Sequence, residues 1–173
     1  AVRRAERQTA GEIVPMVVGS SYDYPRADII GGAAFALPLA IMLTPMVGAH
    51  LWIGSQNMWI FLMLFILWFL VFFVTVKSVP PLKRIFIPQS EMAEEVEEAA
   101  TTAFFKEGLH RTRDETGVLI FISVFEKKVW VLADRAVNEK VGEGQWLSVV
   151  RHIAEGIRQH RHAEAVCEAI DMI

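Results

Sequence analysis

The chain has 173 residues, enough for one small soluble domain plus a helical hairpin. Hydrophobic residues make up 53% of it, above the ~45–50% typical of globular domains, and the net charge of −3 argues against a nucleic-acid partner. The one cysteine, Cys167, excludes an intrachain disulfide framework.

The first expected element is a strand over residues 12–18, a short β-branched stretch with the sequence EIVPMVV. Pro15 indicates an edge position or a strand start, because proline has no N–H to donate to a central ladder. This strand has no neighbour in the residues around it, so its partner must come from later in the chain.

Two uncharged apolar runs follow, at residues 29–47 and 58–76, and Asp28 is the only ionised side chain between residues 27 and 76. Each run is about 19 residues long, which at about 1.5 Å per helical residue crosses most of a ~30 Å hydrocarbon core. We therefore predict an integral protein of the inner or plasma membrane, with a transmembrane hairpin over residues 27–77.

Gly32, Ala36 and Ala40 form a row of small residues along the first run. Such a row lets two helices approach closely, and it is compatible either with packing on the second run or with homodimerisation. Pro38 and Pro45 each remove a backbone donor inside this helix, which favours kinks that a neighbouring helix can shield.

The charges near the two runs predict the topology. The connection at residues 48–57 has no Lys, Arg, Asp or Glu, whereas the other side is basic, with Arg26, Lys77, Lys83 and Arg84. Basic residues beside membrane spans mark the cytoplasmic side, so both termini are expected there. Asp28 is expected in the headgroup layer, and a buried functional carboxylate is the alternative.

Beyond the membrane segment the chain alternates between helix and strand signals. Residues 91–107 have the apolar spacing of a helix, with an acidic outer face typical of a solvated surface. Residues 117–125 are an apolar run of strand length, which is typical of a strand covered on both faces. A short polar stretch, residues 126–128, joins it to a second strand at residues 129–133, forming a hairpin.

The remainder is expected to be helical. A helix over residues 145–159 has one apolar stripe, formed by Leu147, Val150, Ile153, Ala154 and Ile157. A helix over residues 163–173 has another, formed by Val166, Cys167 and Ile170. Cys167 is therefore expected to be a buried packing residue, not a nucleophile.

The elements give a β-α-β-β-α-α order and an α/β soluble domain with a small mixed sheet. The first strand pairs in parallel with the strand from Gly117 across a helix, so the membrane hairpin is an insertion within the crossover. The predicted organisation is residues 1–26 as the first part of the soluble domain, 27–77 as the hairpin and 78–173 as the remainder.

The pattern of residues 108–110 (GLH), 114–123 (DETGVLIFIS) and 126–129 (EKKV) resembles the TPM domain family. With residues 12–15 upstream, the chain is similar to a membrane-anchored branch of that family. The resemblance implies a small α/β domain, and the family has been linked to acid phosphatase activity, divalent-cation binding and maintenance of membrane complexes. The family's early acidic loop is absent here, and residues 134–137 stand where members often have a glycine-rich turn.

Three carboxylates are the candidate metal ligands. Asp114 and Glu115 precede the central strand and Asp134 follows its hairpin partner, and an antiparallel pair places those positions at one end of the sheet. Hard oxygen ligands suit Ca²⁺ or Mg²⁺, with water or carbonyls completing the shell. The alternative is that Asp114 caps a turn and Asp134 pairs with Arg135.

Two further groups are interpreted as solvated surface. His152, His160 and His162 lie late in the chain without a carboxylate partner that the sequence identifies, and a metal site is the alternative. The second group is a basic loop that contains His110, Arg111 and Arg113. A phosphate or lipid-headgroup site is the alternative for this loop.

The sequence contains no phosphate-cradling loop, no zinc-type Cys pair and no HExxH motif. We therefore predict a non-catalytic, membrane-anchored interaction module that responds to a divalent cation. The alternative is a metal-dependent phosphoester hydrolase, which requires a nucleophile or a full metal shell that the sequence does not supply. The expected partners are the lipid bilayer and another membrane protein or a second copy, with no nucleic acid.

Overall fold

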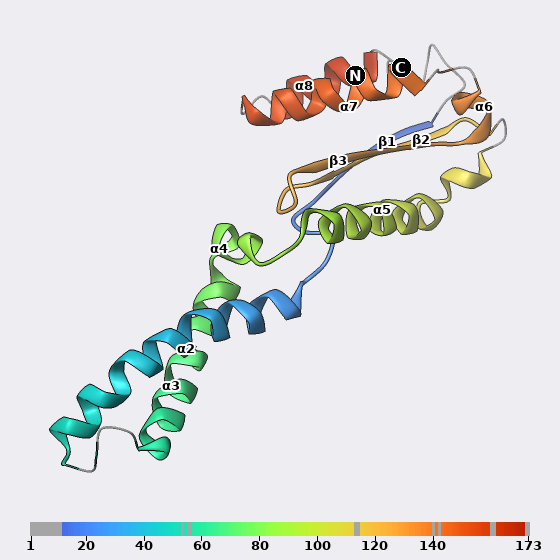
Figure 1. The fold of residues 1–173 in the computed structure, drawn as a ribbon. Coiled ribbons are helices and arrows are strands. Elements are labelled where there is room, and N and C mark those ends of the chain that lie inside the picture. The colour runs from blue at the N-terminus through green and yellow to red at the C-terminus, as the bar shows by residue number, and fades with distance from the viewer. Residues whose placement is uncertain are drawn as a thin grey trace. The chain divides into compact units, whose positions relative to one another are not determined.

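The computed structural model describes residues 12–52, 54, 57–112, 115–139, 141, 143–159 and 162–171. The chain forms two compact units, Ala1–Tyr22 with Ser90–Ile173 (unit 1) and Asp23–Gln89 (unit 2). Figure 1 shows a small sheet with helices in unit 1 and a helical hairpin in unit 2. The predicted mixed α/β class is confirmed.

The sheet of unit 1 has three strands, β1 (Glu12–Val18), β2 (Gly117–Ser123) and β3 (Lys128–Ala133), in the order β1-β2-β3. β1 pairs with β2 in parallel, and β2 pairs with β3 antiparallel. Both pairings confirm the sequence prediction. β2 is the central strand and all of its residues are buried, as its uninterrupted apolar sequence indicates.

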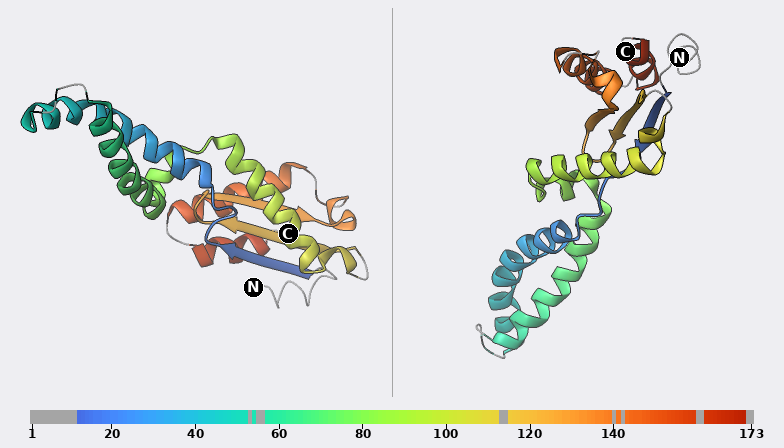
Figure 2. Two further views of the ribbon diagram at one scale, coloured as in Figure 1. Left: turned by 90° about the horizontal axis from the view of Figure 1, so that it is seen from below. Right: turned by 90° about the vertical axis from the view of Figure 1, so that its right-hand side faces the viewer.

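Helices cover both faces of this sheet. α5 (Gln89–Lys106) lies on one face, and α7 (Glu143–Arg158) and α8 (His162–Asp171) lie on the other, as Figure 2 shows from two further directions. Because side chains alternate along a strand, β2 contributes to two cores. Leu119 and Phe121 pack with α5, and the α7–α8 side holds Val118, Ile120 and Ile122.

The structure contains short helices that the sequence analysis did not predict. η1 (Leu109–Arg111) follows α5, and α6 (Arg135–Asn138) follows β3. Gly117 begins β2 directly beneath η1, and a Cβ atom at this position would lie 2.4 Å from the Leu109 carbonyl oxygen. Glycine is therefore required there, because a backbone oxygen cannot move aside as the end of a flexible side chain could.

The predicted apolar stripes of the last two helices are only partly right, because Ile153 and Ile170 are buried as expected while other members are exposed. Leu147 is 65% exposed, whereas Val149 and Ile153 are fully buried in the core. Cys167 is exposed, which contradicts its predicted packing role. The buried positions of α8 include Ala165 and Ala169, whose small side chains allow a close approach of the helix.

Unit 2 consists of α2 (Pro25–His50), α3 (Met58–Ser78) and the short α4 (Pro80–Ile85). α2 and α3 are long and apolar enough to cross a membrane. Asn57 caps α3, since its Oδ1 accepts hydrogen bonds from Trp59 N at 2.9 Å and Ile60 N at 3.4 Å.

The row of small residues on α2 packs within the chain. Ala36 and Ala40 are fully buried, and a Cβ atom at Gly32 would lie 3.2 Å from the backbone of Phe73 in α3. The row continues to Thr44, whose hydroxyl donates to the Ala40 carbonyl at 2.6 Å. Intramolecular packing on α3 therefore accounts for this row.

Candidate functional site

The backbone brings two of the predicted metal ligands to one end of the sheet. Asp134 N donates to Gly117 O at 2.8 Å, and Ala136 N donates to Glu115 O at 3.2 Å. The residue that precedes β2 by two positions therefore lies beside the residue that follows β3. Asp114, the third predicted ligand, lies outside the described residues.

One carboxylate oxygen of Asp134 accepts a hydrogen bond, and the other does not within the described part of the chain. Oδ1 accepts from Arg135 N at 2.8 Å and caps α6, while Oδ2 is buried without a hydrogen-bond partner among the described residues. Buried carboxylate oxygens normally have a partner, so this atom fits a cation ligand. Glu115 is exposed, with a left-handed backbone at φ 52°.

No cluster of three or more His, Cys, Asp or Glu side chains with metal-binding geometry occurs within the described part of the chain. Glu115 and Asp134 supply at most two side-chain ligands, and Arg135 is engaged in an exposed ion pair with Glu139 at 2.9 Å. The three-carboxylate site with Ca²⁺ or Mg²⁺ therefore stays a prediction.

The opposite end of the sheet holds a buried carboxylate that the sequence analysis missed. Glu126 is fully buried in the β2–β3 turn, where it had been assigned to a charged tight turn. Its Oε1 accepts from Ser21 N at 3.0 Å and from Ser20 Oγ at 3.2 Å, and its Oε2 accepts from Ser123 Oγ. The parallel register is the signal that was available, because Val18 pairs with Ser123 and places the following serines beside the turn.

One glutamate on the acidic face of α5, Glu95, has a raised pKa. Burial raises the pKa of Glu95, and the negative charges of Glu98, Glu91, Glu126 and Glu94 raise the pKa of Glu95 further. Like charges within a few ångströms disfavour ionisation of each carboxyl, so Glu95 holds a proton more readily than an isolated glutamate.

The remaining predicted clusters are only partly within the described residues. His152 Nε2 lies 2.6 Å from Glu168 Oε2, which links α7 to α8 and supplies a carboxylate partner that the sequence analysis did not identify. His160 and Arg113 lie outside the described residues. The His110 ring contacts Phe105 with 5.0 Å between ring centroids.

Unit 2 has a charged pair at the base of its hairpin. Asp28 is only 4% exposed, and Lys83 Nζ lies 2.9 Å from its Oδ1 and 3.0 Å from its Oδ2. Lys83 also donates to the backbone oxygen of Asp23. The structure buries Asp28 against Lys83, and the ion pair offsets the desolvation of both charges. The expected place of Asp28 in the headgroup layer stays a prediction.

Comparison with known proteins supports the resemblance seen in the sequence. The family model described as TPM domain matches residues 70–173, more than half of the chain. The matched segment contains β2 and β3, while β1 lies before it. No curated protein and no solved structure matches the chain. The chain belongs to the TPM domain family.

Proposed function

We propose that this chain is a membrane-anchored TPM module without catalytic activity. In this function α2 and α3 cross the bilayer as a hairpin, and unit 1 binds another membrane protein or a second copy of the chain at the membrane surface. The parts of unit 1 on both sides of the insertion stay on the same side of the membrane.

The apolar surface of α3 carries this proposal. Nine large hydrophobic side chains of this helix are exposed, namely Met58, Trp59, Leu62, Met63, Ile66, Leu67, Leu70, Val71 and Val74. Full exposure of one such side chain forfeits about 1.5–3 kcal/mol relative to burial, so the set amounts to on the order of 10 kcal/mol in water. That is comparable to the ~5–15 kcal/mol stability of a whole domain, and a lipid environment removes the cost.

We place both termini in the cytoplasm. Arg26 and Lys77 are exposed at one end of the hairpin, and the connection at the other end has no Lys, Arg, Asp or Glu. This asymmetry follows the positive-inside rule.

Cysteine labelling in intact cells tests the membrane topology. In a Cys167→Ser background, Gly54→Cys is expected to react with a membrane-impermeant maleimide before lysis. The matched variant Glu94→Cys, at an exposed position on α5, is expected to react only after lysis. Labelling of Glu94→Cys in intact cells would reverse the topology. If neither variant reacts before lysis and both react after it, the spanning hairpin is wrong.

The module is further proposed to respond to Ca²⁺ or Mg²⁺ at the sheet end that carries Asp134. The unpartnered Asp134 Oδ2 supports this, and Asp114 and Glu115 are the other side-chain ligands. The cation supplies charge neutralisation when bound, and weak affinity is expected because calcium usually takes six to eight ligands.

Titration with Ca²⁺ or Mg²⁺, followed by backbone amide signals, tests this response. Signals of residues 114, 115 and 134 are expected to shift in the parent and to stay in place in Asp134→Asn. Unmoved signals at millimolar cation would leave the interaction module without a cofactor. Metal-dependent turnover of a chromogenic phosphoester would instead support the hydrolase alternative.

A further inference from the structure

The short helix α4 is held against the base of the hairpin by its polar and aromatic contacts. Lys83 forms the buried pair with Asp28, and the Phe86 ring packs edge-on against Phe35 with 5.8 Å between centroids. Ile87 is also buried, at 5% exposure. These contacts fix which side of α4 faces the hairpin and which side faces outward.

The outward side of α4 is apolar. Ile85 is 74% exposed, Val79 is 38% exposed, and Pro80 and Pro81 are exposed as well. An isoleucine held outward beside a helix that is long and apolar enough to cross a membrane is suited to the boundary between headgroups and acyl chains.

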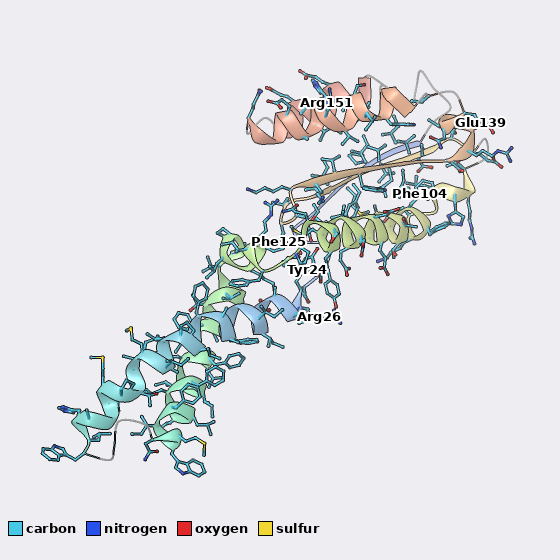
Figure 3. The ribbon with its side chains drawn as sticks, in the orientation of Figure 1. Tyr24, Arg26, Phe104, Phe125, Glu139 and Arg151 are labelled. Carbon is cyan, nitrogen blue, oxygen red and sulfur yellow. The ribbon has the colours of Figure 1, made fainter. Side chains whose placement is uncertain are left out.

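Two exposed cations, Arg26 and Lys77, lie at the same end of the hairpin as α4, which the Asp28–Lys83 pair joins to the first turn of α2. Arg26 lies in the first turn of α2 and Lys77 in the last turn of α3, and both are exposed (Figure 3 labels Arg26). The two turns lie at the same end of the hairpin, since a Cβ atom at Gly31 would lie 2.9 Å from Val76 Cγ1. Lys83 does not add to this charge, because Asp28 neutralises it.

We propose that α4 lies in the plane of the headgroup layer and that Arg26 and Lys77 beside it bind an anionic phospholipid. Charge complementarity selects this occupant, because an anionic headgroup matches the two exposed cations while its acyl chains cover Ile85 and Val79. Within the described residues of unit 2, Asp23 is the exposed carboxylate at this end, and Lys83 donates to its backbone oxygen. The inference rests on the proposed membrane anchoring.

Nitroxide accessibility tests the depth of α4 in the full chain reconstituted in lipid nanodiscs. In a Cys167→Ser background, labels are placed at Leu67 in α3, at Ile85 in α4 and at Glu94 in α5, all of which are exposed. Labels at 67 and 85 are expected to collide more with oxygen than with a polar nickel complex, and the label at 94 is expected to show the reverse. If the label at 85 behaves as aqueous while the label at 67 does not, the α4 inference is wrong. If 67 is also aqueous, the membrane anchoring itself is wrong.

Competition between spin-labelled lipids tests the headgroup preference. The parent is expected to associate several-fold more strongly with phosphatidylglycerol than with phosphatidylcholine. The double variant Arg26→Gln and Lys77→Gln is expected to abolish this preference. Arg151→Gln, at an exposed position in unit 1, is the matched control and is expected to leave the ratio unchanged.

Three results would overturn the headgroup assignment. The first is a parent ratio near one, and the second is a ratio that the double variant leaves unchanged. The third is loss of the preference on adding inorganic phosphate at constant ionic strength, which would assign the two cations to a soluble anion.

Discussion

Glu126 is a buried residue whose removal should destabilise unit 1. Its carboxylate accepts hydrogen bonds from Ser20, Ser21 and Ser123, and it joins the end of β1 to the β2–β3 turn. Glu126→Ala leaves the Ser21 N–H and the Ser123 hydroxyl without this acceptor, and each unsatisfied buried group costs about 1–3 kcal/mol. We expect a loss of about 3–5 kcal/mol in the free energy of unfolding, measured by urea denaturation in detergent.

Ser20→Ala is the matched control for this change. Of the three bonds to Glu126 it removes only the longest, at 3.2 Å, and it also removes the bond from this exposed hydroxyl to the Tyr22 carbonyl, at 2.6 Å. Its expected cost is below about 1 kcal/mol, because both bonds are made at an exposed serine. Equal unfolding midpoints for the two variants would show that Glu126 does not hold these segments together.

Glu95 gives a pH dependence of known sign. Its raised pKa in the folded state stabilises the protein fully below the ordinary value of 4.5, and this contribution is lost as the pH rises through the folded-state pKa. At pH 7 the ionised Glu95 faces like charges on α5, so Glu95→Gln is expected to raise stability by about 0.5 kcal/mol. The gain should vanish below pH 4.5 in melting curves.

Glu97→Gln is the control, because it removes the same charge from an exposed position on the same helix. An equal gain for Glu97→Gln would assign the effect to net charge alone. A gain for Glu95→Gln that persists unchanged at low pH would assign it to a cause other than charge, because the carboxyl is then protonated.

At the scale of elements, the α2–α3 contact depends on the absence of side-chain bulk. Leucine at Gly32 must displace the Phe73 backbone, which lies 3.2 Å from the Cβ position. Overpacking of this kind costs about 1–3 kcal/mol, so Gly32→Leu is expected to lower the melting temperature in detergent. Ala34→Leu adds bulk at an exposed position of the same helix and is expected to have little effect.

The outcome also separates the two uses of the small-residue row. If Gly32→Leu and Ala34→Leu melt alike while only Gly32→Leu changes the oligomeric state, the row serves homodimerisation. A change in neither property would remove the row from any interface.

Strand pairing was predictable from the sequence, but helix rotation was not. β1 has no neighbour in its own part of the chain, so its partner had to come from later in the sequence, and the almost entirely apolar β2 is typical of a central strand. In α7, Trp146, Val149 and Ile153 form one apolar stripe, and Leu147, Val150 and Ala154 form with the shared Ile153 a second stripe beside it. Periodicity cannot choose between two adjacent stripes, and contact with the sheet decides in favour of the first.

At the scale of the whole molecule, unit 1 is assembled from two distant parts of the chain. A fragment of residues 90–173 lacks β1 and leaves one edge of the fully buried β2 unpaired, so we expect it to aggregate or to unfold. Residues 12–22 joined to 90–173 by a flexible Gly-Ser linker should fold, since they contain all three strands. Amide spectra and light scattering distinguish the two, and a well-dispersed spectrum from the shorter fragment would show that β1 is dispensable.

The positions of the charged groups were predictable only where a single local element, such as a hairpin, brings them together. Glu115 and Asp134 follow from the β2–β3 hairpin alone, and the backbone bonds at that end agree with it. The pair of Asp28 and Lys83 joins residues 55 positions apart, and burial of Glu126 depends on serines that follow β1. Such contacts require the full tertiary arrangement, because neither charge pattern nor periodicity reports which distant residues meet.

The parallel pairing of β1 with β2 also sets an order of events during synthesis. Ser21 and Glu126 are 105 residues apart, and at about 5–20 residues per second the ribosome needs roughly 5–20 s to supply the second half of that contact. β1 must therefore wait, unpaired, while all of unit 2 is made. Completion of unit 1 is the later step, so a nascent chain arrested within unit 2 presents an incomplete sheet to chaperones and proteases.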